Sequence, residues 1–235
     1  MTTILAAGTF LVCLPVCAMH TSGPIPRPSH RPSMPVVIDA GHGGDDFGAS
    51  VKGLREKDIA LAVALKLKAR LKKLPVVLTR ETDRYVDLDE RVINSVDWNG
   101  ALFISIHLNE VRSHKTSGAT IYSYGPDRRR RWRRRSHPDV LPLPAPPLVA
   151  AKEGEFLARS MEKFLREAGI RAETEKSDYY VLKNPSAPSV LVELGFLSNP
   201  EESAKLAGAA YQNLLVESLA RAIEDYMSKR ALKAE

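Results

Sequence analysis

The sequence feature that most constrains the fold is an apolar run that turns into a glycine-rich loop and then into a helical pattern. Val36, Val37 and Ile38 are β-branched residues, which suit a buried strand, and four glycines follow between positions 41 and 48. Apolar residues then recur every four positions over residues 59–71, and residues 76–79, Val-Val-Leu-Thr, have the composition of a second strand. A strand, a helix and a second strand in this order favour parallel pairing, so we expect an α/β fold.

The rest of the chain continues this alternation. The further predicted elements are a helix at 88–96, strands at 102–107 and 119–124, a helix at 148–168, strands at 179–182 and 189–195, and a helix from about 202 to 227. A length of 235 residues suits one sizeable domain with a leader and an insertion. We therefore predict a single α/β domain over residues 36–230, built as a mostly parallel twisted sheet flanked by helices.

The first 18 residues are predicted to form a signal peptide. They contain no charged side chain, carry an apolar run over residues 4–18 and end in Val16-Cys17-Ala18, whose small residues suit signal peptidase. We expect cleavage near Met19, a Pro/Ser-rich linker over residues 19–35, and an exported protein of the periplasm or cell envelope. The alternatives are a buried helix and lipidation at Cys17, although Pro15 and Val16 fit a lipidation site poorly.

The two cysteines limit the chemistry of any metal site. Cys13 and Cys17 both lie in the leader, so the mature domain would contain no thiol. A metal site in this domain must therefore use histidine and carboxylate ligands.

The net charge of +6 comes from one local segment. Seven arginines lie within residues 128–135, and removing them from the 34 lysines and arginines leaves 27 basic residues against 28 acidic ones. The basicity therefore belongs to an Arg/Pro-rich insertion at about 125–147, and the chain has no general basic face for nucleic acid. We interpret the insertion as a solvated basic arm that contacts anionic wall polymers or lipid headgroups.

Three side chains are candidates for a metal site. His42 follows the first strand, Glu56 lies in the first turn of the next helix, and His107 ends the strand at 102–107. Ligands bind at the carboxyl ends of strands in open α/β sheets, and catalytic zinc commonly takes three such protein ligands. Asp45 and Asp46 are alternative ligands, or residues that form the turn and orient an imidazole.

Glu193 is the candidate catalytic residue. It follows an apolar run at residues 189–192, where a carboxylate is unusual unless it has a function. Beside a metal it could take a proton from water and return it to a leaving amine. A salt-bridged core glutamate is the alternative interpretation. For Arg80 and Asn109 we favour structural roles.

Several blocks of sequence resemble the zinc-dependent N-acetylmuramoyl-L-alanine amidases. They are Asp39-Ala40-Gly41-His42-Gly43-Gly44 with Asp46, Gly48 and Ala49, then Glu56-Lys57, Ser105-Ile106-His107-Leu108-Asn109, and Val192-Glu193-Leu194-Gly195-Phe196-Leu197-Ser198-Asn199. The resemblance covers residues 36 to about 228. It implies that His42, Glu56 and His107 bind one zinc ion and that Glu193 is the catalytic carboxylate.

The resemblance also implies a reaction, a substrate and partners. The reaction is hydrolysis of the amide between the lactyl group of N-acetylmuramic acid and L-alanine of the peptidoglycan stem peptide, in cell-wall remodelling or daughter-cell separation. It admits an activator protein as a partner, and we expect a monomer. The alternatives are a peptidoglycan carboxypeptidase, a non-catalytic wall-binding module and an anion-binding protein.

Overall fold

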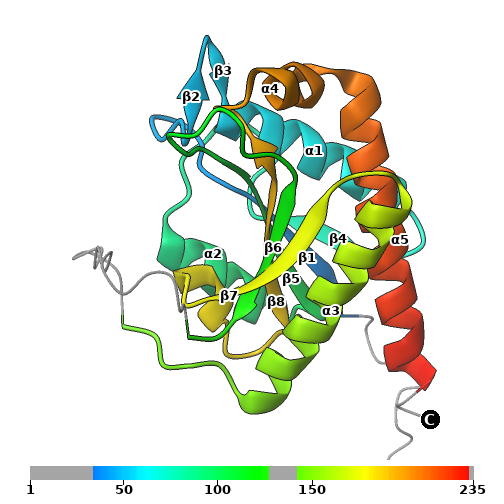
Figure 1. The fold of residues 1–235 in the computed structure, drawn as a ribbon. Helices are drawn as coiled ribbons and strands as arrows, with labels where there is room; N and C mark the ends of the chain where they lie inside the picture. The colour runs from blue at the N-terminus through cyan, green and yellow to red at the C-terminus, as the bar shows by residue number, and fades with distance from the viewer. Residues whose placement is uncertain (1–33, 127–141, 233–235) are drawn as a thin grey trace, which may run out of the picture. The chain divides into compact units, whose positions relative to one another are not determined.

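A six-stranded sheet forms the centre of the protein in the computed structural model, which describes residues 34–126 and 142–232 (Figure 1). The strands are β1 (Val36–Ala40), β4 (Val76–Leu78), β5 (Leu102–Asn109), β6 (Ala119–Tyr124), β7 (Ala172–Ser177) and β8 (Ser189–Phe196). Their order is β4-β1-β5-β8-β6-β7. The first four run parallel, whereas β6 is antiparallel to β8 and parallel to β7. This confirms the predicted mostly parallel sheet.

The first part of the chain forms the predicted strand, helix and strand. All five residues of β1 are buried, as expected for a strand covered on both faces. Helix α1 (Glu56–Arg70) follows and buries Ile59, Val63 and Leu67 at four-residue spacing. Between them lies a short antiparallel hairpin of β2 (Ser50–Val51) and β3 (Leu54–Arg55), which the sequence did not predict. The hairpin leads directly into Glu56.

Helices cover both faces of the sheet. Val36 and Ile38 face a core formed with α1, α3 (Leu148–Glu167) and α5 (Ala209–Leu232). Val37 points to the other face, where Val92 of α2 (Leu88–Asp97) and Leu182 of the short 3₁₀ helix η1 (Tyr180–Lys183) form a smaller core. Alternate residues of one strand thus face different helices. In Figure 1, α3 and α5 lie on the right of the sheet and α2 on the left.

The structure corrects three predicted elements. Residues 179–182 were predicted as a strand, but they contribute to η1, because Val181 and Leu182 turn inward against the smaller core. Strand β7 was missed because its middle residues, Glu-Thr-Glu-Lys, are polar, as an edge strand permits. The single last helix is two helices, α4 (Pro200–Ala207) and α5, which are separated at Gly208.

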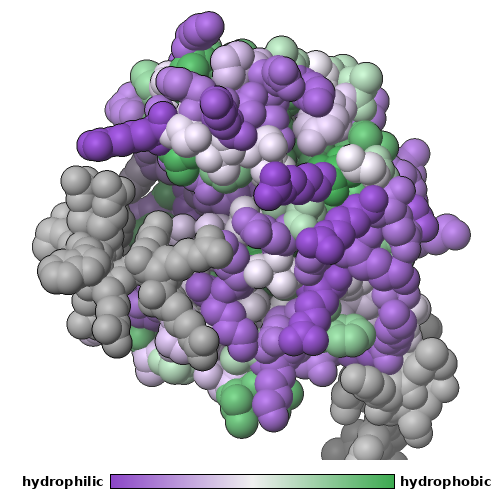
Figure 2. Space-filling model, in the orientation of Figure 1, coloured by the Kyte–Doolittle hydropathy of each residue, from purple (hydrophilic) through white to green (hydrophobic). Residues whose placement is uncertain are grey.

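Several predicted segments lie outside the described residues. These are the leader, nearly all of the linker and the arginine run at 128–135. At the end of the predicted insertion, Pro147 immediately precedes α3. Among helices in the described part of the chain, none combines the length and apolar character of a membrane span. On the face drawn in Figure 2, hydrophilic residues predominate and apolar residues are scattered.

Candidate metal centre

His42 lies in a tight loop directly after β1. Its backbone has a φ of 57°, in the left-handed region that a histidine adopts at some cost. Its Nδ1 lies 2.7 Å from Oδ2 of Asp46. A carboxylate that holds one ring nitrogen fixes the orientation of the imidazole, so Nε2 faces the site. Of the two alternative aspartates, both of which are exposed, only Asp46 forms this hydrogen bond, so Asp46 orients the imidazole.

Glu56 is the first residue of α1 and is buried. Its Oε1 lies 3.1 Å from Nε2 of His42 and 2.8 Å from Nδ1 of His107. The backbone N–H groups of Ala49 and Leu108 donate to its Oε2 and Oε1 at 2.8 and 2.9 Å. Burial opposes ionisation of Glu56, but the hydrogen bonds and charges of the two histidines hold its pKa below the usual range. Hydrogen bonds to both of its oxygens thus fix the position of the Glu56 carboxylate.

His107 completes the cluster from the neighbouring strand β5. Its ring meets that of His42 edge to face, with 4.9 Å between the ring centroids. One donor atom from each of His42, Glu56 and His107 lies within 4.8 Å of the other two. Two imidazole nitrogens and one carboxylate oxygen form a ligand set that zinc commonly uses in catalytic sites. The structure therefore brings together the three predicted ligands, and their chemistry fits a zinc ion.

Burial and charge act in opposite directions on His42. Burial disfavours the protonated imidazole, whereas Glu56 and Asp46 favour it through hydrogen bonds and charge, and the pKa of His42 lies above its usual value. An imidazole must be deprotonated at the nitrogen that binds a metal, so proton and metal compete at this residue.

Two buried arginines brace the loop that carries His42. Arg80 donates to the carbonyl oxygens of Ala40 and Gly41 at 2.9 and 2.8 Å. Arg91 donates to the carbonyl oxygens of Ala40 and His42, both at 2.9 Å. The three successive carbonyl groups are therefore held by side chains from β4's end and from α2. The favoured structural role of Arg80 agrees with these contacts.

Asp39 binds Arg91, one of these two arginines, and this role was not predicted from the sequence. Its fully buried carboxylate accepts hydrogen bonds from Arg91, Ser105 and Thr79 at 2.6, 2.6 and 2.7 Å. Burial raises the pKa of Asp39, but Arg91 and the two hydroxyl groups outweigh this effect and hold the pKa below its usual value. An ionisable residue directly after the β-branched run at 36–38, still inside the buried strand, was the available signal, because such a carboxylate needs a partner.

Glu193 lies one strand away from the three clustered side chains. It is half-buried on β8 and pairs in register with His107 of β5 and Thr120 of β6. Residues in register on neighbouring strands point to the same face of a sheet and lie about 5 Å apart in their backbones. Glu193 therefore flanks the site without belonging to the His-Glu-His cluster. Asn109, two residues after His107, accepts a backbone hydrogen bond from Leu197.

Gly48 is required where the loop passes the cluster. A Cβ atom there would lie 2.4 Å from Oε2 of Glu56 and 2.6 Å from Cδ2 of His42, and φ is +65°. We expect Gly48→Ala to lower the free energy of unfolding by about 1–3 kcal/mol and to weaken metal binding, because both candidate ligands, Glu56 and His42, must move. Chemical denaturation and chelator competition measure the two effects.

The matched control is Gly53→Ala in the β2–β3 turn. Gly53 also has a positive φ, of 82°, but a Cβ there meets no atom within 4 Å. The Gly53→Ala variant should destabilise the fold, because alanine disfavours a positive φ, and it should leave metal affinity unchanged. Equal metal affinity in both variants would contradict the argument for Gly48.

The fold and the cluster together define a class of protein. A mostly parallel sheet gathers two imidazoles and a buried carboxylate at the carboxyl ends of β1 and β5, next to the start of α1. This arrangement has the donor set of a hydrolytic metal centre in an α/β protein.

Comparison with known proteins gives the family. The family model described as N-acetylmuramoyl-L-alanine amidase matches residues 36–225, and the chain belongs to this family of peptidoglycan amidases. The germination-specific N-acetylmuramoyl-L-alanine amidase of Bacillus subtilis is 30% identical over 214 residues, which cover 83% of this chain and 80% of the relative.

Solved structures agree with this assignment. N-acetylmuramoyl-L-alanine amidase AmiC2 of Nostoc punctiforme is 32% identical with a TM-score of 0.69, over 83% of this chain and 97% of that chain. The CwlD amidase of Clostridioides difficile, in complex with the GerS lipoprotein, is 28% identical with a TM-score of 0.68, over 83% and 99%. The predicted fold class, family and enzymatic activity are therefore confirmed.

Proposed function

We propose that the chain hydrolyses the amide between the lactyl group of N-acetylmuramic acid and L-alanine of the stem peptide with one zinc ion. His42, Glu56 and His107 would hold the ion. The observation that carries this proposal is the convergence of their three donor atoms within 4.8 Å at the carboxyl edge of the sheet. When bound, zinc would polarise the amide carbonyl and lower the pKa of water.

The side chains at the site have different roles in the proposed reaction. Glu56 and the two histidines bind the ion, and Asp46 orients His42 through its hydrogen bond of 2.7 Å. Glu193 accepts a proton from the attacking water as the C–O bond forms, and returns it to the nitrogen as the C–N bond breaks. The products are a lactyl carboxylate on the glycan and a peptide with a free amino group on L-alanine.

Mass spectrometry of digested peptidoglycan tests this reaction. Purified peptidoglycan is incubated with zinc-loaded enzyme, and we expect soluble stem peptides that begin with L-alanine. A peptidoglycan carboxypeptidase would instead release single amino acids from the carboxyl end of the stem. A wall-binding module would release nothing, which would refute catalysis.

Cell-wall remodelling or daughter-cell separation is the proposed physiological role. An activator protein is a proposed partner, and the solved complex of CwlD with the GerS lipoprotein supports this idea by example. Co-purification from the native envelope tests it. Recovery of the enzyme as a fully active monomer would count against a required activator.

Export is the proposed route to the substrate. Residues 1–18 would be removed as a signal peptide, leaving residues 19–35 as a linker to the catalytic domain in the periplasm or cell envelope. Amino-terminal sequencing of protein from the native cell should find a start near Met19. An intact amino terminus on cytosolic protein would contradict export.

The arginine run at 128–135 is proposed to attract anionic wall polymers or lipid headgroups, because it concentrates seven positive charges. Deletion of residues 126–147 should reduce binding to anionic vesicles, and salt should weaken the binding of the complete chain. Unchanged binding after the deletion would refute this role.

A further inference from the structure

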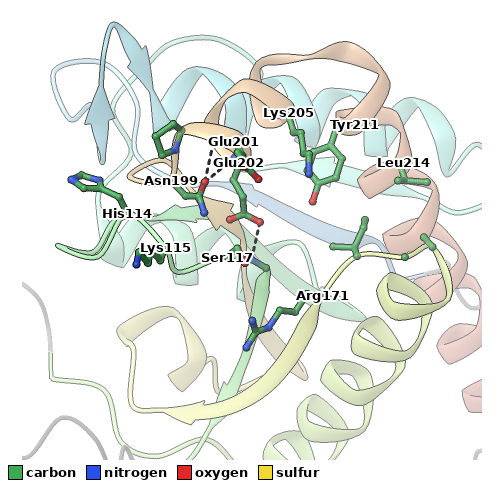
Figure 3. Close-up of a pocket in the computed structure, with 15 residues that line it drawn as sticks. His114, Lys115, Ser117, Arg171, Asn199, Glu201, Glu202, Lys205, Tyr211 and Leu214 are labelled. Atoms are coloured by element: carbon green, nitrogen blue, oxygen red, sulfur yellow. Dashed lines mark hydrogen bonds between the residues drawn. The ribbon is translucent and has the colours of Figure 1, made fainter.

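A groove lies along the same edge of the sheet as the metal centre. It consists of a larger hollow of about 600 Å³ and a smaller one of about 240 Å³, which are adjacent because both are lined by His114 and Pro200. We call this feature the edge groove. Figure 3 shows the larger hollow, with Asn199 and Glu202 between His114 on one side and Tyr211 on the other. A volume of this size suits a ligand rather than a few waters.

The edge groove carries positive charge that the fold does not neutralise. Lys115, Arg171 and Lys205 line the larger hollow and Lys52 lines the smaller one, and all four are exposed. Within the described ranges, none of them forms an ion pair with an acidic side chain, whereas Arg70 on α1, for example, pairs with two glutamates. The four cations give the edge groove a positive local potential, which attracts anions.

Two glutamates, Glu201 and Glu202, also line the larger hollow and oppose this charge in part. Glu202 is buried, and its two oxygens accept hydrogen bonds from the backbone N–H groups of Gly118 and Phe196 at 2.7 and 2.8 Å. These hydrogen bonds fix the position of the Glu202 carboxylate, and the exposed Glu201 is the second acid of the lining. The four cations around the groove outnumber these two acids.

The smaller hollow begins close to the metal centre. Val51 in its wall lies two residues after Ala49, whose N–H group binds Glu56. Leu197 in the same wall donates to the carbonyl of Asn109, two residues after His107. Two residues of extended chain span on the order of 7 Å. An extended peptide of four or five residues spans about 13–18 Å, so one that starts at the metal centre can enter the groove.

We propose that the edge groove binds the stem peptide of the substrate through its free carboxylates. This inference rests on the proposed hydrolysis, which places the bond before L-alanine at the metal centre and leaves the peptide to extend away from it. The peptide is the anionic part of this substrate, because the muramic carboxyl group is consumed in the amide. Lys52, Lys115, Arg171 and Lys205 would attract those carboxylates and set a preference for free over amidated stems.

The test compares two soluble substrates with one variant. The substrates are an N-acetylmuramoyl tripeptide with free carboxylates and the same compound with carboxamides, and the variant combines Lys115→Gln, Arg171→Gln and Lys205→Gln. We expect KM for the carboxylate substrate to rise about tenfold, since each exposed ion pair contributes up to a few-fold. KM for the carboxamide and both kcat values should change less than about twofold.

The control variant removes three charges elsewhere. Lys72→Gln, Lys73→Gln and Lys152→Gln alter exposed cations at the α1–β4 turn and at the start of α3, away from the groove. This variant should behave like wild type. An unchanged KM in the groove variant, an equal rise for both substrates, or the same rise in the control would each overturn the proposal. Thermal unfolding verifies that the variants are folded. If the triple variant is not folded, the single variant Arg171→Gln replaces it, and we expect a smaller rise in KM.

Direct binding separates failure of this proposal from failure of the proposed reaction. Calorimetry with the free tripeptide and its carboxamide needs no turnover, so it reports on the groove even if neither substrate is cleaved. Tighter binding of the carboxylate form by wild type, lost in the triple variant, supports the groove. If the triple variant instead loses only binding to polyphosphate, the groove serves an anionic polymer and the proposal is wrong.

Discussion

Replacing Glu193 by Gln should lower kcat by about a hundredfold or more while zinc content stays at one ion per chain. The substitution keeps the shape of the side chain but removes the proton-accepting oxygen. Glu193 lies in register with His107 on the neighbouring strand, so it flanks the three proposed ligands without being one of them. Metal analysis and steady-state kinetics on soluble muropeptides measure both quantities, and KM should change little.

Asp45→Asn is the control for this experiment. Asp45 is exposed in the loop after His42, and its amide variant should retain near wild-type turnover. A zinc-replete Glu193→Gln enzyme that releases stem peptides at the wild-type rate would remove Glu193 from the mechanism. The proton would then have to be carried by another carboxylate, with Asp45 and Asp46 as the first candidates.

Replacing His107 by Ala should abolish hydrolysis and leave the metal weakly bound. The change removes one of three donors whose atoms lie within 4.8 Å of one another. Asp46→Asn should have a smaller effect, about 10–100-fold in metal affinity, because Asp46 orients His42 but would not touch the ion. Competition with a chromogenic chelator measures the zinc affinity of the wild type and of both variants. Chelation of the wild type should stop activity until zinc is restored.

His114→Ala provides the matched control for metal affinity. His114 also lies at this edge of the sheet, but its Nδ1 donates to the backbone carbonyl of Ser198 at 2.7 Å and it is not in the cluster. Its removal should leave zinc affinity unchanged. If His107→Ala retained a full equivalent of zinc at wild-type affinity, the ligand assignment would be wrong.

The convergence of the three proposed ligands could be predicted because each lies at the end of a strand or the start of a helix. The fold places all three of these positions at the carboxyl edge of the sheet. Parallel β1 and β5 bring His42 and His107 to the same edge, and the helix that follows the first loop starts there with Glu56. These are local patterns combined with one rule about parallel sheets. The ligand roles themselves stay predictions, as do the leader and the insertion.

The supporting contacts could not be predicted because they join residues that are distant in sequence. Arg91 reaches Asp39 across 52 positions, and only the packing of α2 on the sheet makes that contact. Strand β7 is polar in its middle, so its pattern resembles a loop until β6 lies beside it. The edge groove is also formed by loops and helix ends, whose positions no periodicity determines.

The two edge strands of the sheet affect whether the enzyme associates with itself at high concentration. An unpaired strand edge can recruit a second chain and start edge-to-edge aggregation. Here one edge strand, β4, is only three residues long, and the other, β7, carries Glu173, Glu175 and Lys176. Both features discourage strand addition. We therefore expect sedimentation to show one monomeric species as concentration rises, which would let the enzyme diffuse through a wall mesh without assembling on itself.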